Sequence, residues 1–185
     1  MKKIMAPKTT PLRGGSGGAR LLKATAATVL HIDDDPNDAE LLEAAIRKAK
    51  VRFILHNVTD GDQAMAYLNG HGKYADRARF QVPSLILLDL KMPRATGFEV
   101  LKWIRNQPAL GKVAVVILSG SELQDHIQLA YAAGANSYMI KPLGFNALIS
   151  LVKDIDTKWL GCQSGWPWLP QTLSRAEGRI PPSAL

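Results

Sequence analysis

Four apolar runs in this 185-residue sequence are followed by side chains that could bind a metal ion or phosphate. These side chains are Asp33 and Asp34 after residues 28–32, Asp89 after residues 85–88, Ser119 after residues 113–118, and Lys141 after residues 137–140. Buried parallel strands read as unbroken apolar runs. The carboxyl ends of parallel strands lie at one edge of a sheet, where open α/β sheets place their ligands. We therefore expect these side chains to converge at such an edge.

Three carboxylates held within about 4–5 Å would repel one another by a few kcal/mol per pair at an effective dielectric near 20. A raised pKa or a bound divalent cation would relieve that repulsion. Hard oxygen ligands favour Mg²⁺, whereas zinc would require His or Cys. A carboxylate held on Mg²⁺ can act as a nucleophile toward phosphorus, while an ammonium and a hydroxyl bind oxygens of the transferred group. Asp89 alone would more simply be a cap of the following turn, but its partners favour the chemical interpretation.

Helical patterns separate the apolar runs, and a further strand is predicted at residues 53–58. Helices are expected at residues 36–50, around residues 64–68, and at residues 97–106, 122–133 and 145–159. A strand followed by a helix, five times over, predicts an α/β fold with a parallel five-stranded sheet, right-handed crossovers and helices on both faces. Residues 69–82 read as a polar loop that is long for a compact domain, and we interpret them as an insertion.

Composition divides the chain into three parts. Residues 1–24 carry six basic residues, no acidic residue and no periodicity, so we predict a disordered basic leader. Residues 25–160 form the predicted domain, in which basic and acidic residues balance, so the net charge of +7 arises outside it. Residues 161–185 form a tail with Trp166 and Trp168, which we expect to be partly ordered because exposed tryptophans are costly.

Several functions are disfavoured by the same composition. An electrically neutral domain argues against specific nucleic-acid binding, although the leader could touch phosphate weakly. Cys162 is the only cysteine, so no intrachain disulfide can form, which suits a reducing cytosol. No apolar run approaches the ~18 residues of a membrane span, and Pro and Gly interrupt any signal-peptide core in the leader. We expect a cytoplasmic protein without a membrane partner.

The combination of these strand-end residues resembles the receiver domains of two-component response regulators, which have the CheY-like, flavodoxin-type fold. The resemblance covers about residues 28–159 and implies a doubly wound (βα)5 sheet with strand order 2-1-3-4-5. It implies that Asp89 is the phosphoacceptor. It also implies that Asp34 binds Mg²⁺ directly, that Asp33 acts through water, and that Asp89 and the backbone carbonyl of Lys91 complete the metal site.

The remaining strand-end residues match switch and phosphate-binding positions of the same family. The resemblance implies that Lys141 binds the phosphoryl group, that Ser119 is the switch hydroxyl and that Tyr138 is the aromatic switch residue. It further implies a cis peptide bond between Lys141 and Pro142, which only X–Pro bonds tolerate cheaply.

The resemblance to receiver domains also implies a function. The resemblance implies a phosphorelay receiver that takes a phosphoryl group from a sensor histidine kinase and is no enzyme beyond slow autodephosphorylation. The loop at residues 69–82 and the lack of an output segment resemble single-domain phytochrome-associated response regulators, with a phytochrome as the candidate kinase. The signal would pass by a conformational change to a protein, such as a downstream phosphotransfer protein. We also expect a homodimer through the side formed by helix four, strand five and helix five.

Nucleic-acid binding through the basic leader stays open as a primary role, and so do two further functions. A dehalogenase-type phosphohydrolase would need a second Asp two residues after Asp89, where this chain has Lys91. A receiver-fold scaffold that works without phosphorylation is the other alternative. His31 and His56 lie inside strands, and we interpret them as inward-facing residues satisfied by neighbours. Asp35 is interpreted as a solvated or capping residue, and Gly144 lacks the capping side chain of many relatives.

Overall fold

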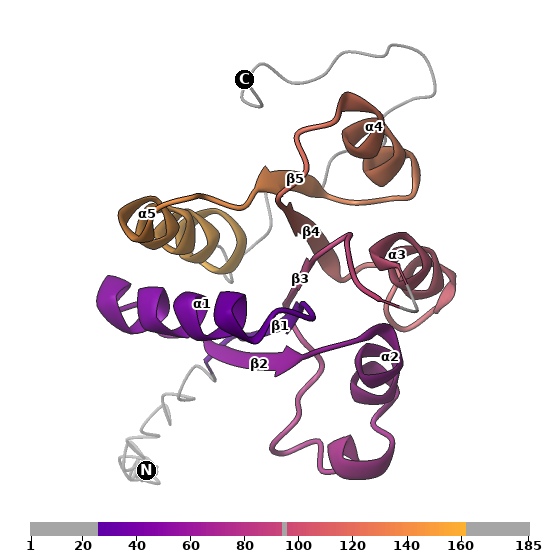
Figure 1. The fold of residues 1–185 in the computed structure, drawn as a ribbon. Coiled ribbons are helices and arrows are strands. Elements are labelled where there is room, and N and C mark those ends of the chain that lie inside the picture. The colour runs from indigo at the N-terminus through magenta and orange to yellow at the C-terminus, as the bar shows by residue number, and fades with distance from the viewer. Residues whose placement is uncertain (1–25, 94–95, 162–185) are drawn as a thin grey trace, which may run out of the picture.

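The structure is a computed structural model that describes residues 26–93 and 96–161, in which strands and helices alternate (Figure 1). The strands are Thr28–Ile32 (β1), Ile54–Val58 (β2), Leu85–Leu88 (β3), Ala114–Ser119 (β4) and Ser137–Ile140 (β5). The helices are Pro36–Ala49 (α1), Gly61–Asn69 (α2), Gly97–Asn106 (α3), Gln124–Ala132 (α4) and Phe145–Ile155 (α5). A short 3₁₀ turn covers Gly72–Tyr74 (η1), and a π-helical turn, Asp156–Leu160 (η2), follows α5.

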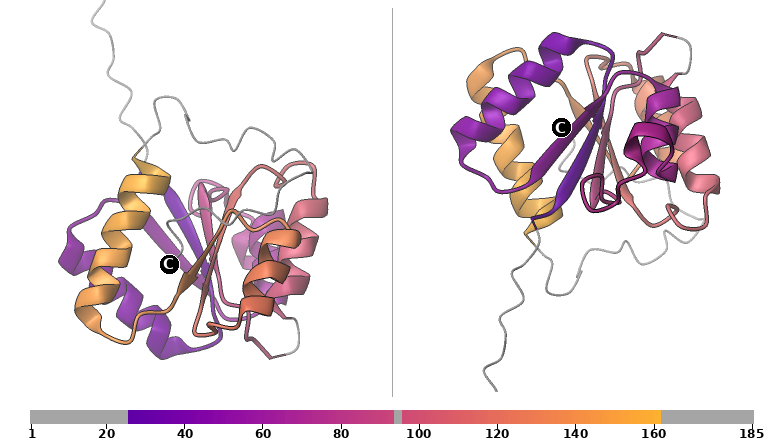
Figure 2. Two further views of the ribbon diagram at one scale, coloured as in Figure 1. Left: turned by 90° about the horizontal axis from the view of Figure 1, so that it is seen from above. Right: turned by 90° about the horizontal axis from the view of Figure 1, so that it is seen from below.

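The strands form one parallel sheet in the order β2-β1-β3-β4-β5. Helices α1 and α5 cover one face of this sheet, and α2, α3 and α4 cover the other (Figure 2). The predicted α/β fold and strand order are therefore confirmed. The register pairs Ile32 of β1 with Leu88 of β3, and Leu88 with Ile117 of β4. The residues that follow these strands consequently emerge at neighbouring points of one edge.

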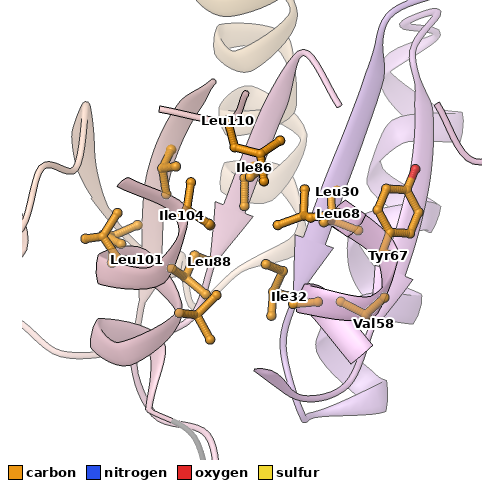
Figure 3. Close-up of a cluster of buried hydrophobic side chains, with 14 of the residues drawn as sticks. Leu30, Ile32, Val58, Tyr67, Leu68, Ile86, Leu88, Leu101, Ile104 and Leu110 are labelled. Carbon is orange, nitrogen blue, oxygen red and sulfur yellow. The ribbon is translucent and has the colours of Figure 1, made fainter. Parts of the chain in front are cut away.

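Apolar side chains fill both faces of the sheet. Successive residues of β3 point to opposite faces. Ile86 and Leu88 belong to the cluster under α2 and α3, whereas Leu85 and Leu87 belong to the cluster under α1 and α5. Figure 3 shows the first of these clusters, with Ile86 and Leu88 beside side chains of α3. All four residues are 0% exposed, and burial of each side chain contributes about 1.5–3 kcal/mol. This burial fixes β3 and with it the position of Asp89.

The helices that follow β1 and β3 begin at caps close to the sheet edge. Asp35 accepts a hydrogen bond from the backbone N–H two residues further on (2.9 Å), ahead of Pro36 in the first turn of α1. The capping interpretation of Asp35 is therefore confirmed. Thr96 and Glu99 form a reciprocal capping box at the start of α3. Helix α5 begins after Gly144 without a side-chain cap, as the residue type led us to expect.

The segment interpreted as a polar insertion, residues 69–82, is packed against α2. Tyr74 is 5% exposed, and its ring lies 5.2 Å from the rings of both Tyr67 and Phe80. The Arg77 guanidinium donates to two carbonyls in the last turns of α2, at 2.9 and 2.6 Å. The last carbonyls of a helix lack helical N–H partners. Arg77 supplies donors to two such carbonyls at the end of α2. The aromatic residues and Arg77 therefore hold this segment in an ordered conformation against α2.

One prediction about the backbone is wrong. The peptide bond between Lys141 and Pro142 is trans, since no cis peptide bond occurs among the described residues. The trans form of an X–Pro bond is favoured by about 0.5–1 kcal/mol where no turn demands cis. Here the Lys141 N–H donates to the Ser119 carbonyl at 2.9 Å, so β5 brings Lys141 to the sheet edge with a trans bond.

The predicted leader at residues 1–24, and Trp166 and Trp168 of the predicted tail, lie outside the described residues. Trp159 in η2 is partly buried and packs against the cluster under α1 and α5. Within residues 26–93 and 96–161, no helix combines the length and the apolar character needed to cross a bilayer.

Candidate functional site

Three carboxylates meet at the carboxyl edge of the sheet. Asp33 and Asp34 follow β1, Asp89 follows the adjacent β3, and one oxygen of each lies within 4.8 Å of the others. Asp33 and Asp89 are buried, at 2% and 5% exposure, and Asp34 is more open to solvent. Oδ1 of Asp89 is buried and makes no hydrogen bond within the described part of the chain. The predicted convergence of these side chains is confirmed, and their all-oxygen arrangement fits a hard divalent cation.

The ammonium of Lys141 lies beside this acid cluster. Its Nζ is 2.7 Å from Oδ2 of Asp33 and 3.7 Å from Oδ2 of Asp89. It is also 2.7 Å from Oδ2 of Asp38, in the first turn of α1. Burial alone would lower the pKa of Lys141, but the contacts with Asp33 and Asp38 outweigh it, and the pKa is raised. Lys141 therefore supplies a permanent positive charge beside the carboxylates of Asp33, Asp38 and Asp89.

The buried carboxylates Asp33 and Asp89 differ in how well the protein stabilises their charge. Burial would raise the pKa of Asp33, but the contacts of its carboxylate with His31 and Lys141 outweigh burial and lower the pKa. Burial raises the pKa of Asp89; Lys141 opposes that rise, and the Asp33 carboxylate adds to it. The negative charge of Asp89 is thus the less compensated of the two, and a bound cation would favour it.

Ser119 and Tyr138 connect the site to the loop between β4 and α4. Ser119 ends β4 and is 0% exposed. Its buried Oγ makes no hydrogen bond in the described chain. Burial raises the pKa of Tyr138, as it does that of Asp89. The Tyr138 hydroxyl donates to the Ser121 carbonyl at 2.8 Å, and Ser121 Oγ lies 2.8 Å from Nδ1 of His126 on α4. Tyr138 of β5 is therefore hydrogen-bonded to the loop that follows Ser119.

The loop after β3 contains Lys91 and leads to Gly97 at the start of α3. The side chain of Lys91 is exposed, so it does not join the acid cluster, and the predicted metal-binding role of its backbone carbonyl stays a prediction. Gly97 packs against the backbone of Asp89, because a Cβ at this position would stand 2.1 Å from the Asp89 carbonyl oxygen. Only glycine permits this approach of α3 to the loop.

Both strand histidines face inward, as predicted. Nδ1 of His31 lies 3.1 Å from Oδ1 of Asn57, and Nε2 lies 3.4 Å from Asp33, so His31 is satisfied by neighbours. His56 packs between the rings of Tyr67 and Phe80. Its buried Nε2 makes no hydrogen bond among the described residues, and burial lowers the pKa of His56.

Sequence reasoning missed Asp38 and Gly97. Asp38 was overlooked because it lies on a helix rather than after an apolar run. The available signal was its place four residues after Asp34, one helical turn beyond the acidic pair. Gly97 had no signal beyond its place after the loop that follows Asp89, since only the packing reveals how closely the two segments approach.

Comparison with known proteins agrees with this fold. The family model for the response regulator receiver domain matches residues 29–153, and the chain belongs to that family. Response regulator Rcp1 of Synechocystis sp. is 33% identical over 132 residues, which cover 71% of this chain and 88% of Rcp1.

Solved structures give the same result. The phosphorylated cyanobacterial phytochrome response regulator RcpA is 36% identical with a TM-score of 0.66, covering 74% of this chain and 95% of RcpA. The Mn²⁺-bound form of Rcp1 is 31% identical with a TM-score of 0.65, covering 74% of this chain and 96% of that one. Its similarity to these proteins places the chain beside phytochrome response regulators within the family.

Proposed function

We propose that this receiver domain accepts a phosphoryl group on Asp89 from the phosphohistidine of a sensor histidine kinase. A carboxylate oxygen of Asp89 forms a bond to phosphorus while the phosphorus–nitrogen bond of the donor breaks, and the electron pair of that bond returns to the imidazole nitrogen. The observation that carries the proposal is the meeting of Asp89 with two further acids and Lys141 at one sheet edge. The product is a phosphorylated protein that loses phosphate slowly, without turnover of a small substrate.

A divalent cation, Mg²⁺ by the chemistry of the ligands, is part of this proposal. Asp33, Asp34 and Asp89, with the backbone carbonyl of Lys91, would hold it, and when bound it would offset the negative charge of the transferred group. The fit rests on the all-oxygen cluster and on the buried Oδ1 of Asp89, which makes no hydrogen bond in the described chain. The relative Rcp1 has been solved in a Mn²⁺-bound form.

The other strand-end residues bind the phosphoryl group and transmit its arrival. Lys141 neutralises charge on the phosphoryl oxygens, and the Ser119 hydroxyl moves toward them. Because Tyr138 is hydrogen-bonded to the Ser121 carbonyl, a shift of the Ser119 loop also moves this ring. Phosphorylation thereby biases a two-state equilibrium of α4 and β5, which a protein partner reads.

The partners follow from the same proposal. Phytochrome response regulators among the relatives make a phytochrome the candidate kinase, and a phosphotransfer protein is a candidate downstream partner. Exposed apolar side chains near the start of α4, at the end of β5 and at the start of α5 support a homodimer through this side. They are Leu123, Ile140, Leu143 and Phe145. We further assign the receiver to residues 25–160 and the protein to the cytoplasm.

Phosphorylation can be tested with a small phosphodonor. The purified protein is incubated with acetyl phosphate and Mg²⁺, and its intact mass is followed. The proposal predicts one phosphoryl adduct that depends on Mg²⁺ and is absent from Asp89→Asn. An adduct that persists in Asp89→Asn would refute the assignment of Asp89. Absence of any adduct would favour the scaffold alternative, and rapid release of phosphate from a phosphate ester would favour a hydrolase.

A further inference from the structure

Lys141 has a carboxylate partner that the acid cluster does not contain. Its Nζ contacts Oδ2 of Asp38 and Oδ2 of Asp33 at the same distance, 2.7 Å. The distance from Nζ to Oδ2 of Asp89 is 3.7 Å, which is too long for a hydrogen bond. The ammonium therefore lies on the α1 side of the site, away from the carboxylate that would be phosphorylated.

Asp38 differs from the other acids around Lys141. Asp33 and Asp89 belong to the cluster that would hold the cation, whereas Asp38 does not. Asp38 lies in the first turn of α1, which Asp35 caps, so its carboxylate is presented by a fixed backbone. Lys141 reaches Asp38 with a flexible four-carbon chain, whereas the Asp38 carboxylate stands one carbon from the helix backbone, so the ammonium can move further than the carboxylate.

We propose that Asp38 is a positioning residue that holds the Lys141 ammonium on the α1 side and competes for it with the phosphoryl group on Asp89. The inference rests on the proposed phosphoacceptor function. To bind a phosphoryl oxygen, the ammonium must give up or share its contact with Asp38. The Asp38 carboxylate therefore weakens the hold of the site on a phosphoryl group and shortens the lifetime of the phosphorylated state.

Beryllofluoride, a non-covalent mimic of the phosphoryl group, provides the test. It is titrated into the full chain at saturating Mg²⁺, and the bound species is followed by fluorine NMR. Asp38→Asn is expected to bind it about fivefold more tightly than the wild type, the effect of removing one partly exposed ion pair. Glu40→Gln is the matched control, because it removes the same charge from an exposed position on the same helix. Its affinity should stay within about twofold of the wild type.

A double-mutant cycle shows whether Asp38 acts through Lys141. In a Lys141→Met background, Asp38→Asn should leave the affinity for beryllofluoride unchanged. Should Lys141→Met bind too weakly to measure or fail to fold, Asp38→Glu replaces it: this variant keeps a carboxylate for the ammonium and should restore the weaker, wild-type affinity.

The outcomes separate this inference from the proposed function. An Asp38→Asn protein that binds beryllofluoride no more tightly than the wild type would overturn the role of Asp38 while leaving the phosphoacceptor function intact. Tighter binding that persists in Lys141→Met, or that Glu40→Gln shares, would mean a general charge effect and would overturn it too. A wild-type protein that binds no beryllofluoride and forms no adduct with acetyl phosphate would overturn both.

Discussion

Gly97 is the position where we expect one added methyl group to do most damage to the site. An added Cβ would stand 2.1 Å from the Asp89 carbonyl oxygen and 2.8 Å from Cα of Leu90. Both are backbone atoms, so no change of rotamer can relieve the overlap. The Gly97 N–H also donates to the Leu90 carbonyl at 3.2 Å, which holds the start of α3 against this loop. Gly97→Ala must therefore push the two segments apart and displace Asp89.

The size of this effect follows from two opposing contributions. Overpacking typically costs about 1–3 kcal/mol, and more where backbone has to move. The better helix propensity of Ala returns up to about 1 kcal/mol. We expect Gly97→Ala to lower the free energy of unfolding by about 2 kcal/mol in urea denaturation, and to slow labelling by acetyl phosphate.

Gly120→Ala is the control for this experiment, because an added Cβ there meets nothing within 4 Å. Its free energy of unfolding should change by less than about 0.5 kcal/mol. The reasoning would be refuted by a Gly97→Ala protein that is as stable as the wild type and is labelled at the same rate.

Three further predictions concern the charges of the site and the packing of α3. Without Mg²⁺, Asp89→Asn should stabilise the protein at neutral pH, because burial raises the pKa of Asp89 and so disfavours its ionised form in the folded state. Urea midpoints measured across pH should show this gain in stability shrinking as the pH falls through the raised pKa. A gain that does not depend on pH would contradict the prediction. Mg²⁺ at 100 times its Kd should add about 2.7 kcal/mol of stability to the wild type and little to Asp34→Asn, as thermal melts with and without Mg²⁺ would reveal. Arg105→Met should cost about 2–3 kcal/mol in urea denaturation, because the half-buried guanidinium donates to four acceptors before and after β4, three of them at 2.7–2.9 Å. Arg47→Met on the exposed face of α1 should cost under about 0.5 kcal/mol. Equal losses would contradict the stabilising role of the Arg105 hydrogen bonds.

The fold and most of the site could be predicted because both depend on local patterns. A run such as residues 85–88 is apolar at every position only if both faces of the strand are covered. Once five strands alternate with helices, the parallel sheet and its common edge follow, although β2 and β5 are less apolar than β3. The approach of Asp33, Asp89 and Lys141 then needs no further information, since each follows or ends a strand at that edge.

The features that escaped prediction depend on how the elements pack. Whether Asp38 or Glu40 faces Lys141 is set by the rotation of α1 against the sheet, which the sequence of the helix alone does not specify. The sequence of residues 69–82 predicts a polar loop, but the segment packs against α2, where the Arg77 guanidinium donates to backbone carbonyls. The isomer of the Lys141–Pro142 bond has no clear signal in the sequence, because the two forms differ by only about 1 kcal/mol.

The most direct test of the account is to locate the phosphoryl group on the protein. After labelling with acetyl phosphate and Mg²⁺, borohydride reduces an aspartyl phosphate to homoserine, and peptide mass spectrometry locates the altered residue. The account predicts homoserine at position 89 and at no other acidic position. Homoserine at Asp33, Asp34 or Asp38, with Asp89 unaltered, would contradict it.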